Sequence, residues 1–157
     1  MKYYYKYNYK ICNLFIAEEN NTIHNVRFEF EENIFTKYSG EIKKTETPLL
    51  KEAAKQLDEY FSGKRKVFDL PLKANGTEFQ KKVWKALTII PCGQTRSYEQ
   101  IAIMIDKPKA CRAVGLANNK NPIAIIIPCH RVIGKDGKLT GYAGGLELKQ
   151  KLLELEK

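Results

Sequence analysis

The run Ile-Ile-Ile-Pro-Cys-His-Arg-Val at residues 125–132 constrains the fold more than any other stretch of the 157 residues. Three consecutive β-branched isoleucines are typical of a strand buried on both faces, and Pro128 cannot donate a ladder hydrogen bond, so we expect the strand to end there. Cys129 and His130 would therefore lie directly after the end of a core strand. In an ideal strand adjacent side chains point to opposite faces, so adjacency alone does not make them a catalytic pair.

The basic charge is concentrated in the second half of the chain. Of the net charge of +9, residues 73–157 contribute +8, with 15 Lys and Arg against 7 Asp and Glu. Such an excess indicates either a polyanionic partner or a well-solvated surface. The composition is that of a globular protein, and the chain is long enough for one domain or two small ones.

The cysteines show no CxxC pair and no compact disulfide spacing; they are Cys12, Cys92, Cys111 and Cys129. This pattern favours free thiols in a reducing cytoplasm. The apolar window 14–17 is too short for a signal peptide or a membrane span, so we expect a cytoplasmic protein with no membrane partner. Cys12 and His24 would supply only two metal ligands, so we expect no zinc and no other cofactor.

Residues 1–72 predict a small domain of sheet and helix. Alternating side chains over 3–11 and 26–30 predict two strands that pair as a hairpin. Thr47 before Pro48 predicts the start of a helix that Gly63 closes, and residues 67–70 suit a short final strand. Residues 73–77 are expected to be a linker to a second domain over 78–157.

The second domain is predicted to be mostly helical. The capping boxes Thr77–Gln80 and Ser97–Gln100 start two helices. A third helix over 109–118 follows the second one after a tight turn, which indicates a helix-turn-helix. Any helical hairpin would show this pattern, but the basic charge of this half favours DNA binding. Asp136-Gly137 predicts a hairpin turn, and 146–156 predicts a closing helix.

The chemistry of Cys129 has three interpretations. A cysteine nucleophile needs thiolate character, a base and access to substrate, and Cys129 can have all three. It can also be a buried small hydrophobic residue. A cysteine hydrolase would need a histidine from a distant segment, and the only other histidine, His24, lies in the other domain.

The motif Pro-Cys-His-Arg-Val at 128–132 is preceded by Asn121-Pro122 and by a small-residue helix with Arg112, and it is followed by Thr-Gly-Tyr-Ala-Gly-Gly-Leu at 140–146. In this order and spacing, residues 77–156 closely resemble the O6-alkylguanine-DNA alkyltransferases. The resemblance implies an α+β fold, in which a small N-terminal β-sheet-plus-helix domain precedes a mostly helical, winged-helix-like domain with a helix-turn-helix.

The resemblance also implies the reaction. A protein of this family would repair DNA by transferring the alkyl group of O6-alkylguanine, mainly O6-methylguanine with O4-methylthymine as a further substrate, irreversibly to its own Cys129. His130 matches the family's base, which reaches the cysteine through water, and Glu156 matches the carboxylate that orients it. Tyr98 matches the tyrosine that protonates the leaving guanine, and Asn121 the residue that braces the cysteine loop.

DNA recognition follows from the same resemblance. The damaged base must be flipped out of the duplex, and Arg112 matches the arginine that fills its place. The second helix is expected in the minor groove of double-stranded DNA, bound by a monomer without sequence preference. The remaining DNA-contacting residues would be Tyr98, Ala110, Ala113, Gly115 and Asn118. The residues expected to line the base pocket are Val132, Tyr142, Ala143 and Gly144.

The alternative function is a non-catalytic helix-turn-helix module or alkyl-damage sensor. The sensors that resemble this family lack the cysteine, so Cys129 argues against that class. A regulator would also be expected to present side chains that read base edges in the major groove, and the small-residue helix offers few of them.

Overall fold

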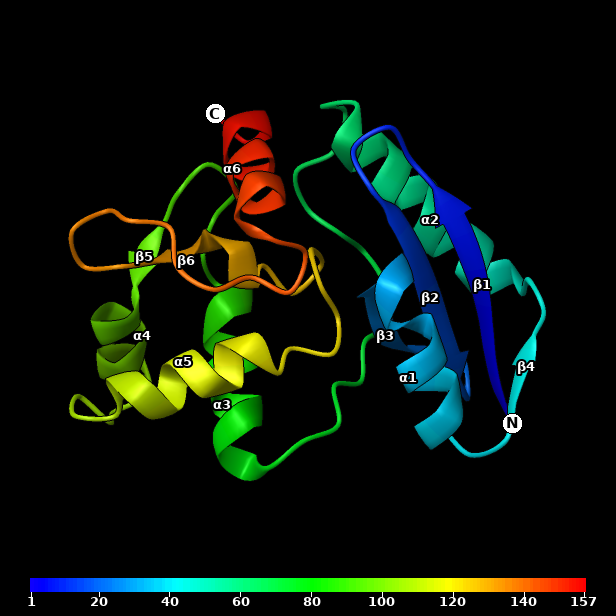
Figure 1. Ribbon diagram of the computed structural model, residues 1–157, viewed down its shortest axis with the longest axis horizontal. Coiled ribbons are helices and arrows are strands. Elements are labelled where there is room, and N and C mark those ends of the chain that lie inside the picture. Colours follow the sequence, from blue (N-terminus) through cyan, green and yellow to red (C-terminus); the bar gives the residue numbers. More distant parts are fainter. The chain divides into compact units, whose positions relative to one another are not determined.

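The computed structural model describes residues 1–157, which form two compact units, Met1–Ala74 and Asn75–Lys157 (Figure 1). The first unit is a sheet with helices and the second is mainly helical, so the α+β class predicted from the sequence is confirmed. No helix in the chain combines the length and the apolar character that crossing a membrane requires.

The N-terminal unit is built on a four-stranded sheet with the order β3-β2-β1-β4. The strands are β1 (Lys2–Asn8), β2 (Asn13–Glu19), β3 (Thr22–Phe28) and β4 (Ile42–Lys44). Both β1 and β3 pair with β2 in antiparallel register, and β4 runs parallel to β1. The hairpin predicted between the first two alternating segments is therefore wrong. The apolar run 14–17 is a strand that lies between them, and it lacks alternation because it is completely buried.

Helices cover both faces of this sheet (Figure 1). On one face lies α2 (Pro48–Phe61), whose predicted start is confirmed, because the Thr47 hydroxyl accepts a 3.2 Å hydrogen bond from the Leu50 amide. The opposite face carries the short helix α1 (Glu32–Tyr38), which follows the 3-10 turn η1 (Glu29–Glu31). Through Phe35, α1 packs on Tyr4, Phe15 and Ala17.

The strand predicted over 67–70 is absent. The side chain of Gln56 binds both backbone groups of Asp69, with its Nε2 3.0 Å from the carbonyl and its Oε1 2.9 Å from the amide. These bonds replace a strand ladder at that position. The chain meets the sheet slightly later, where Leu72 forms an isolated parallel bridge with Ile23.

The C-terminal unit begins with two helices whose predicted capping boxes are both confirmed. Thr77 and Gln80 cap α3 (Glu78–Thr88), and Ser97 and Gln100 cap α4 (Tyr98–Met104). A tight turn separates α4 from α5 (Cys111–Asn119), which gives the helix-turn-helix. The indole N–H of Trp84 in α3 donates a buried 2.8 Å hydrogen bond to the Ala117 carbonyl in α5 and fixes the two helices together.

The remaining elements of this unit lie around the Pro-Cys-His-Arg-Val motif at residues 128–132. The 3-10 turn η2 (Cys129–Arg131) leads into β6 (Val132–Ile133), which pairs in parallel with β5 (Arg96–Ser97), and α6 (Leu146–Leu155) closes the chain. The predicted turn at Asp136-Gly137 is present, since Gly137 has φ +82° and Gly134 N–H bonds to the Lys138 carbonyl at 2.8 Å. Such a turn would pair residues 132–134 with residues 139–140 as a hairpin, but this pairing is absent, because β6 pairs with β5.

Candidate active site

The isoleucine run before Cys129 is buried as predicted, but it is not a strand. Residues 123–127 form a compact turn in which the Ile127 amide donates to the Ile123 carbonyl at 3.0 Å. Ile125 has φ +70°, which is a strained conformation for a β-branched residue and costs about 1–3 kcal/mol. The burial of Ile125, only 1% exposed, stabilises this shape.

Asn121 holds both ends of this turn. Its Oδ1 accepts a 3.0 Å hydrogen bond from the Ile123 amide, and its Nδ2 donates to the Ile127 carbonyl at 2.8 Å. The side chain thus supplies the backbone partners that a strand neighbour would have supplied. The turn delivers the chain to Pro128 and fixes where Cys129 begins η2.

Cys129 is 6% exposed and its backbone is held on both sides. Its amide donates to the Ile127 carbonyl at 2.8 Å, and its carbonyl lies 3.4 Å from Nδ2 of Asn118 in α5. Because η2 is a 3-10 turn, Cys129 and His130 are not set on opposite faces as a strand would set them. The geometry that argued against a functional pair is therefore absent.

His130 is completely buried and joined to the end of the chain. Its Nε2 lies 2.7 Å from Oε2 of Glu156, the C-cap residue of α6. An ionised carboxylate only accepts hydrogen bonds, so Nε2 carries the ring proton and Nδ1 keeps its lone pair. That Nδ1 atom is buried without a hydrogen-bond partner in the protein. The ring therefore presents a basic nitrogen to the site.

Arg131 completes the anchoring of Glu156. Its Nε and Nη2 donate to the two carboxylate oxygens at 2.9 Å each, and its Nη1 donates to the Ile90 carbonyl at 2.8 Å. A bidentate arginine is a strong and geometrically specific partner for a carboxylate. This pairing holds the Glu156 side chain in the interior, where it is only 1% exposed. The last turn of α6 is therefore anchored and does not fray.

Burial controls the protonation of His130. Removal from water lowers the pKa of this histidine below its ordinary 6.5, and the Glu156 hydrogen bond and charge oppose the effect only in part. The positive charges of Arg131 and Lys149 lower the pKa further. The imidazole is thus kept neutral, as a base must be.

A buried lysine lies beside the cysteine. Lys149 in α6 is 0% exposed, and its ammonium donates to the carbonyls of Val132 at 2.7 Å and Thr140 at 2.8 Å. Burial lowers the pKa of Lys149, while the negative charge that Cys129 carries as a thiolate raises it. By the reciprocity of this interaction, the ammonium stabilises a thiolate at Cys129.

Tyr98 projects from the start of α4 toward the loop after β6. Its hydroxyl is 2.6 Å from the Thr140 hydroxyl, and its ring lies against Gly115 of α5, where an added Cβ would sit 3.8 Å from the ring. Tyr98 is half-buried. Tyr98 therefore connects the helix-turn-helix, of which it is part, to the segment expected to line a base pocket.

The expected pocket residues differ in exposure. Val132 is fully buried and Tyr142 is half-buried, with its ring edge-on to His130 at a centroid distance of 6.5 Å. Ala143 is exposed and Gly144 is half-buried, so both are accessible from solvent. Tyr142 thus joins the pocket segment to the histidine.

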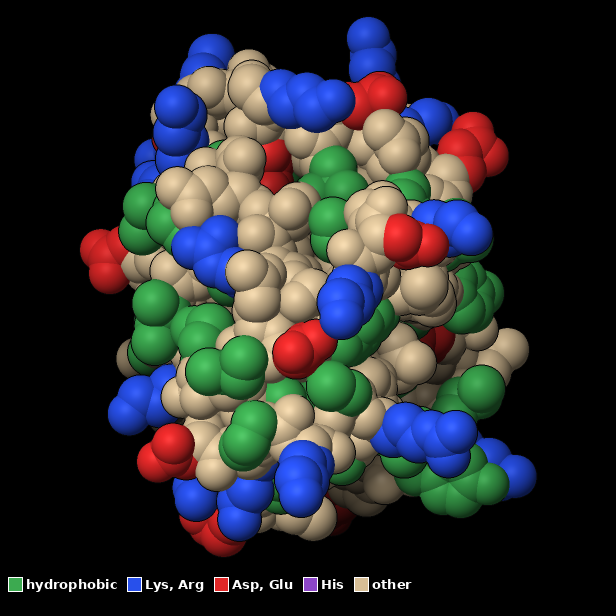
Figure 2. Space-filling view, turned by 90° about the vertical axis from the view of Figure 1, so that its left-hand side faces the viewer, with side chains coloured by type: hydrophobic (Ala, Val, Ile, Leu, Met, Phe, Trp, Pro, Cys, Tyr) green, Lys and Arg blue, Asp and Glu red, His purple; other side chains and the backbone are tan.

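The outer face of α5 carries most of the residues expected to contact DNA. Arg112 and Ala113 are exposed, and Ala110 and Gly115 are half-buried. The expectation for Asn118 is wrong, because its side chain is 2% exposed and turns inward toward the Cys129 carbonyl. Figure 2 views the side of the molecule on which α4 lies and shows Lys and Arg side chains among exposed hydrophobic ones.

Three residues of this site were not singled out from the sequence as functional: Arg131, Thr140 and Lys149. Arg131 and Thr140 lie within the quoted motifs, but their partners are distant in sequence. For Lys149 the sequence contained a signal, because this residue directly follows Leu148, which lies on the buried side of α6. No group of three or more His, Cys, Asp or Glu side chains is arranged to hold a metal, and all four cysteines are free thiols.

Comparisons with known proteins find the same enzymes for both parts of the chain. The family model described as 6-O-methylguanine DNA methyltransferase, DNA binding domain, matches residues 78–157, and the model of the ribonuclease-like domain of the same enzymes matches residues 2–74. A methylated-DNA–protein-cysteine methyltransferase of Methanosarcina barkeri is 68% identical over 69% of this chain and 68% of its own. The constitutive enzyme of that name from Bacillus subtilis is 48% identical over 100% of this chain and 96% of its own.

Solved structures show the same similarity. The O6-methylguanine methyltransferase of Mycobacterium tuberculosis is 46% identical and has a TM-score of 0.88, covering 99% of this chain and 93% of that one. A structure of the M. tuberculosis protein in complex with DNA has a TM-score of 0.89 at 46% identity, covering 98% of this chain and 92% of that one.

Proposed function

The chain belongs to the 6-O-methylguanine DNA methyltransferase family, and on that premise we propose that Cys129 is the residue that accepts the alkyl group. The family assignment makes the protein a DNA repair alkyltransferase, and a non-catalytic DNA-binding module is not favoured. The observation that supports Cys129 is its position beside a neutral, buried histidine whose Nδ1 has no protein partner.

The reaction is an in-line displacement at the alkyl carbon. The Cys129 thiolate forms the carbon–sulfur bond as the carbon–O6 bond breaks, and the electron pair passes to guanine. The thiol proton goes to Nδ1 of His130 through a water molecule. The leaving guanine takes its proton from Tyr98, and the proton held by His130 returns to Tyr98 through solvent, so protons balance. Glu156 holds the imidazole in the tautomer that this transfer needs.

Tyr98 assists the leaving group. A guanine that receives a hydrogen bond or proton as the bond breaks is a better leaving group than the free anion. The Tyr98 hydroxyl is hydrogen-bonded to the Thr140 hydroxyl and lies at the border between α4 and the loop that contains Tyr142. Val132, Tyr142, Ala143 and Gly144 line the pocket for the flipped base.

Duplex DNA binds along α5. The helix presents small residues that allow close backbone approach, which suits the minor groove better than base readout in the major groove. Arg112 enters the stack in place of the flipped base, and Ala110, Ala113 and Gly115 border the groove. Binding is by a monomer, is sequence-independent and weakens with salt, because phosphate contacts supply most of the affinity.

Each molecule reacts once, in the reducing cytoplasm where its thiols stay free. Alkyl transfer leaves a thioether, and thiol exchange cannot cleave this bond as it cleaves a disulfide.

The acceptor is tested with duplex DNA that carries radiolabelled O6-methylguanine. About one equivalent of label should move to the native protein, because the acceptor is consumed. The Cys129→Ser variant should take up none while still binding DNA, and Cys111→Ser is the matched control that should react normally. Label on the Cys129→Ser protein would show that another residue is the acceptor.

The flipping role of Arg112 has its own test. Arg112→Ala should slow repair of duplex DNA much more than reaction with the free base O6-benzylguanine, because only the duplex reaction requires a base to leave the stack. Lys120→Ala removes the same charge at the other end of α5 and should leave the ratio of the two rates unchanged. Equal slowing of both reactions by Arg112→Ala would contradict the role.

A further inference from the structure

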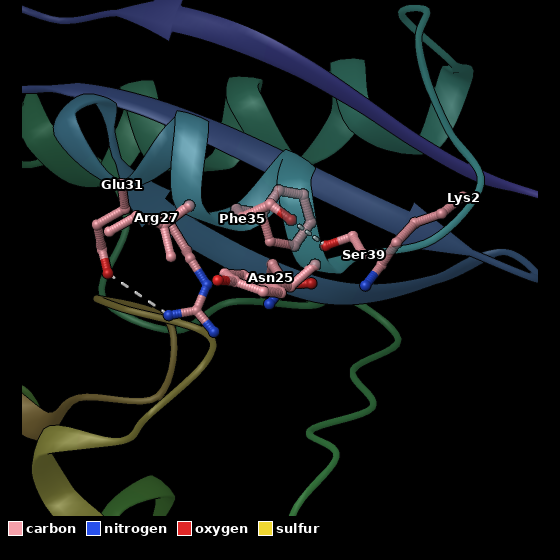
Figure 3. A pocket seen from close by; sticks show the side chains of 8 residues that line it. Lys2, Asn25, Arg27, Glu31, Phe35 and Ser39 are labelled. Atoms are coloured by element: carbon pink, nitrogen blue, oxygen red, sulfur yellow. Dashed lines mark hydrogen bonds and ion pairs between the residues drawn. The ribbon is translucent and has the colours of Figure 1, made fainter.

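A pocket of about 470 Å³ opens on the α1 face of the N-terminal sheet (Figure 3). Asn25 and Arg27 are two residues apart on β3, so both side chains point to this face. The seven-residue helix α1 packs on its aromatic centre and leaves the surrounding surface open. The residues that line the pocket are Lys2, Asn25, Arg27, Glu31, Ile34, Phe35, Tyr38 and Ser39.

The lining carries an excess of positive charge. Figure 3 shows Lys2 and Arg27 on either side of Asn25. Lys2 forms no ion pair, and its ammonium lies 5.0 Å from the centre of the Phe35 ring. Arg27 has one carboxylate nearby, with its Nη1 3.5 Å from Oε2 of Glu31. Among the residues of the lining, two cations therefore face one carboxylate, and the lining has a net charge of +1.

Burial and two nearby charges act on the Lys2 ammonium in opposite directions. Burial lowers the pKa of Lys2, the charge of Glu19 raises it, and the charge of Arg27 lowers it again. Arg27 therefore repels Lys2 across the pocket, although less strongly than Glu19 attracts it. An anion bound between the two cations would relieve this repulsion.

Two buried polar atoms in the same pocket have unmet hydrogen bonds. The Oδ1 of Asn25 is an acceptor without a partner, and the Nε of Arg27 is a donor without one. Asn25 is only 6% exposed, so bulk water does not replace the missing partner freely. Buried polar atoms in folded proteins are nearly always satisfied, so a ligand that brings both an anionic acceptor and a hydrogen donor would complete the set.

The rim adds an apolar, aromatic surface. Tyr38 is 74% exposed and Ile34 is 65% exposed, which is unusual for two large hydrophobic residues beside one cavity. Lys37 lies over one ring face of Tyr38, at 5.3 Å from its centre, and leaves the other face for a planar partner. A planar group that stacks there would cover this surface.

We propose that this pocket binds a nucleotide. Its phosphate lies between Lys2 and Arg27, its sugar or base donates a hydrogen bond to Asn25 Oδ1, and its base packs on Tyr38 and Ile34. A pocket of this volume is within the range of small-ligand sites, and these three features together match a nucleotide better than a bare anion or an apolar ligand. The site uses no residue of the alkyl-transfer centre and goes beyond the proposed function.

The test is a titration of the full chain carrying Cys129→Ser. Two-dimensional NMR spectra of the backbone amides monitor it. Deoxycytidine 5′-monophosphate is the probe, because cytosine is not the base repaired by this family. Saturable shifts at Asn25, Arg27 and Ser39 are expected. Arg27→Gln and Lys2→Gln should each weaken binding at least about tenfold, the value of one charge-assisted hydrogen bond.

Controls separate the parts of the proposal. Lys43→Gln removes one positive charge from the exposed part of β4 and should leave the affinity unchanged. Inorganic phosphate and deoxycytidine should each bind more weakly than the nucleotide; either one binding as tightly would overturn the proposal. Failure of the nucleotide to shift these amides would overturn it as well, and neither result bears on Cys129.

A final comparison identifies the source of the nucleotide. A short single-stranded oligonucleotide with a 5′-phosphate presents the same chemistry at a strand end. Tighter binding than that of the mononucleotide would support a DNA end as the ligand, and weaker binding would support a free nucleotide.

Discussion

The hydroxyl of Tyr98 lies 2.6 Å from the hydroxyl of Thr140, although the two residues are 42 positions apart in the chain. Thr140 is itself fixed, because its carbonyl accepts a 2.8 Å hydrogen bond from the buried ammonium of Lys149. The position of the Tyr98 hydroxyl therefore depends on α6 through a short chain of hydrogen bonds.

Removing the Thr140 hydroxyl should slow alkyl transfer. Thr140→Val keeps the shape of the side chain but leaves Tyr98 without its partner, and one hydrogen bond corresponds to a rate effect of about threefold to tenfold. Single-turnover rates on methylated duplex measure it. Thr140→Ser keeps the hydroxyl and should react at nearly the native rate, so equal rates for the valine and serine variants would refute the positioning role.

Glu156 should matter for stability as well as for reaction. Glu156→Gln removes the charge that faces Arg131 and His130, and breaking a buried ion pair in this way costs about 3–5 kcal/mol. Urea denaturation measures the loss. Glu154→Gln changes the same group on the exposed side of α6 and should alter the free energy of unfolding by less than about 0.5 kcal/mol. A Glu156→Gln protein as stable as the native one would contradict the anchoring.

Stability should fall as the pH drops from 7.5 to 5.5. Burial lowers the pKa of both His130 and His24 in the folded state, so the unfolded chain binds protons at a higher pH. The stability that each contributes is complete above the ordinary value of 6.5 and is lost as the pH falls toward the lowered folded pKa. Carboxylates titrate mainly below this window.

Two variants divide this effect between the histidines. His24→Gln should remove part of the slope of unfolding free energy against pH while alkyl transfer stays normal. His130→Gln should remove the other part and also slow transfer. A slope that neither substitution changes would show that neither histidine is buried in its neutral form.

The sequence predicted the elements whose signals are local. The helices α2, α3 and α4 each have a capping side chain next to an apolar stripe, and all three start at the predicted residue. The strand β2 was missed because burial on both faces removes alternation. The helix α1 was missed because it has only one buried residue, Phe35, and so no stripe.

The loop before Cys129 shows why the site was harder to predict. Three β-branched residues favour a strand, but the side chain of Asn121 supplies the hydrogen bonds that a neighbouring strand would have supplied. The roles of Arg131 and Lys149 likewise depend on partners 25 and 17 residues away. Local patterns do not encode these contacts, although the motif placed Cys129 and His130 in the right region.

Lys149 should set the reactivity of the cysteine. Lys149→Met keeps the length of the side chain and removes the positive charge that favours a thiolate at Cys129. Two carbonyls lose a donor, but an ammonium no longer has to be buried, so the net loss of stability should stay within about 2 kcal/mol. The rate at which iodoacetamide alkylates Cys129, and the rate of repair, should both fall at least about tenfold. Lys151→Met on the exposed side of α6 provides the control and should change neither rate. A folded Lys149→Met protein that reacts with iodoacetamide at the native rate would show that the ammonium serves only to bind the two carbonyls.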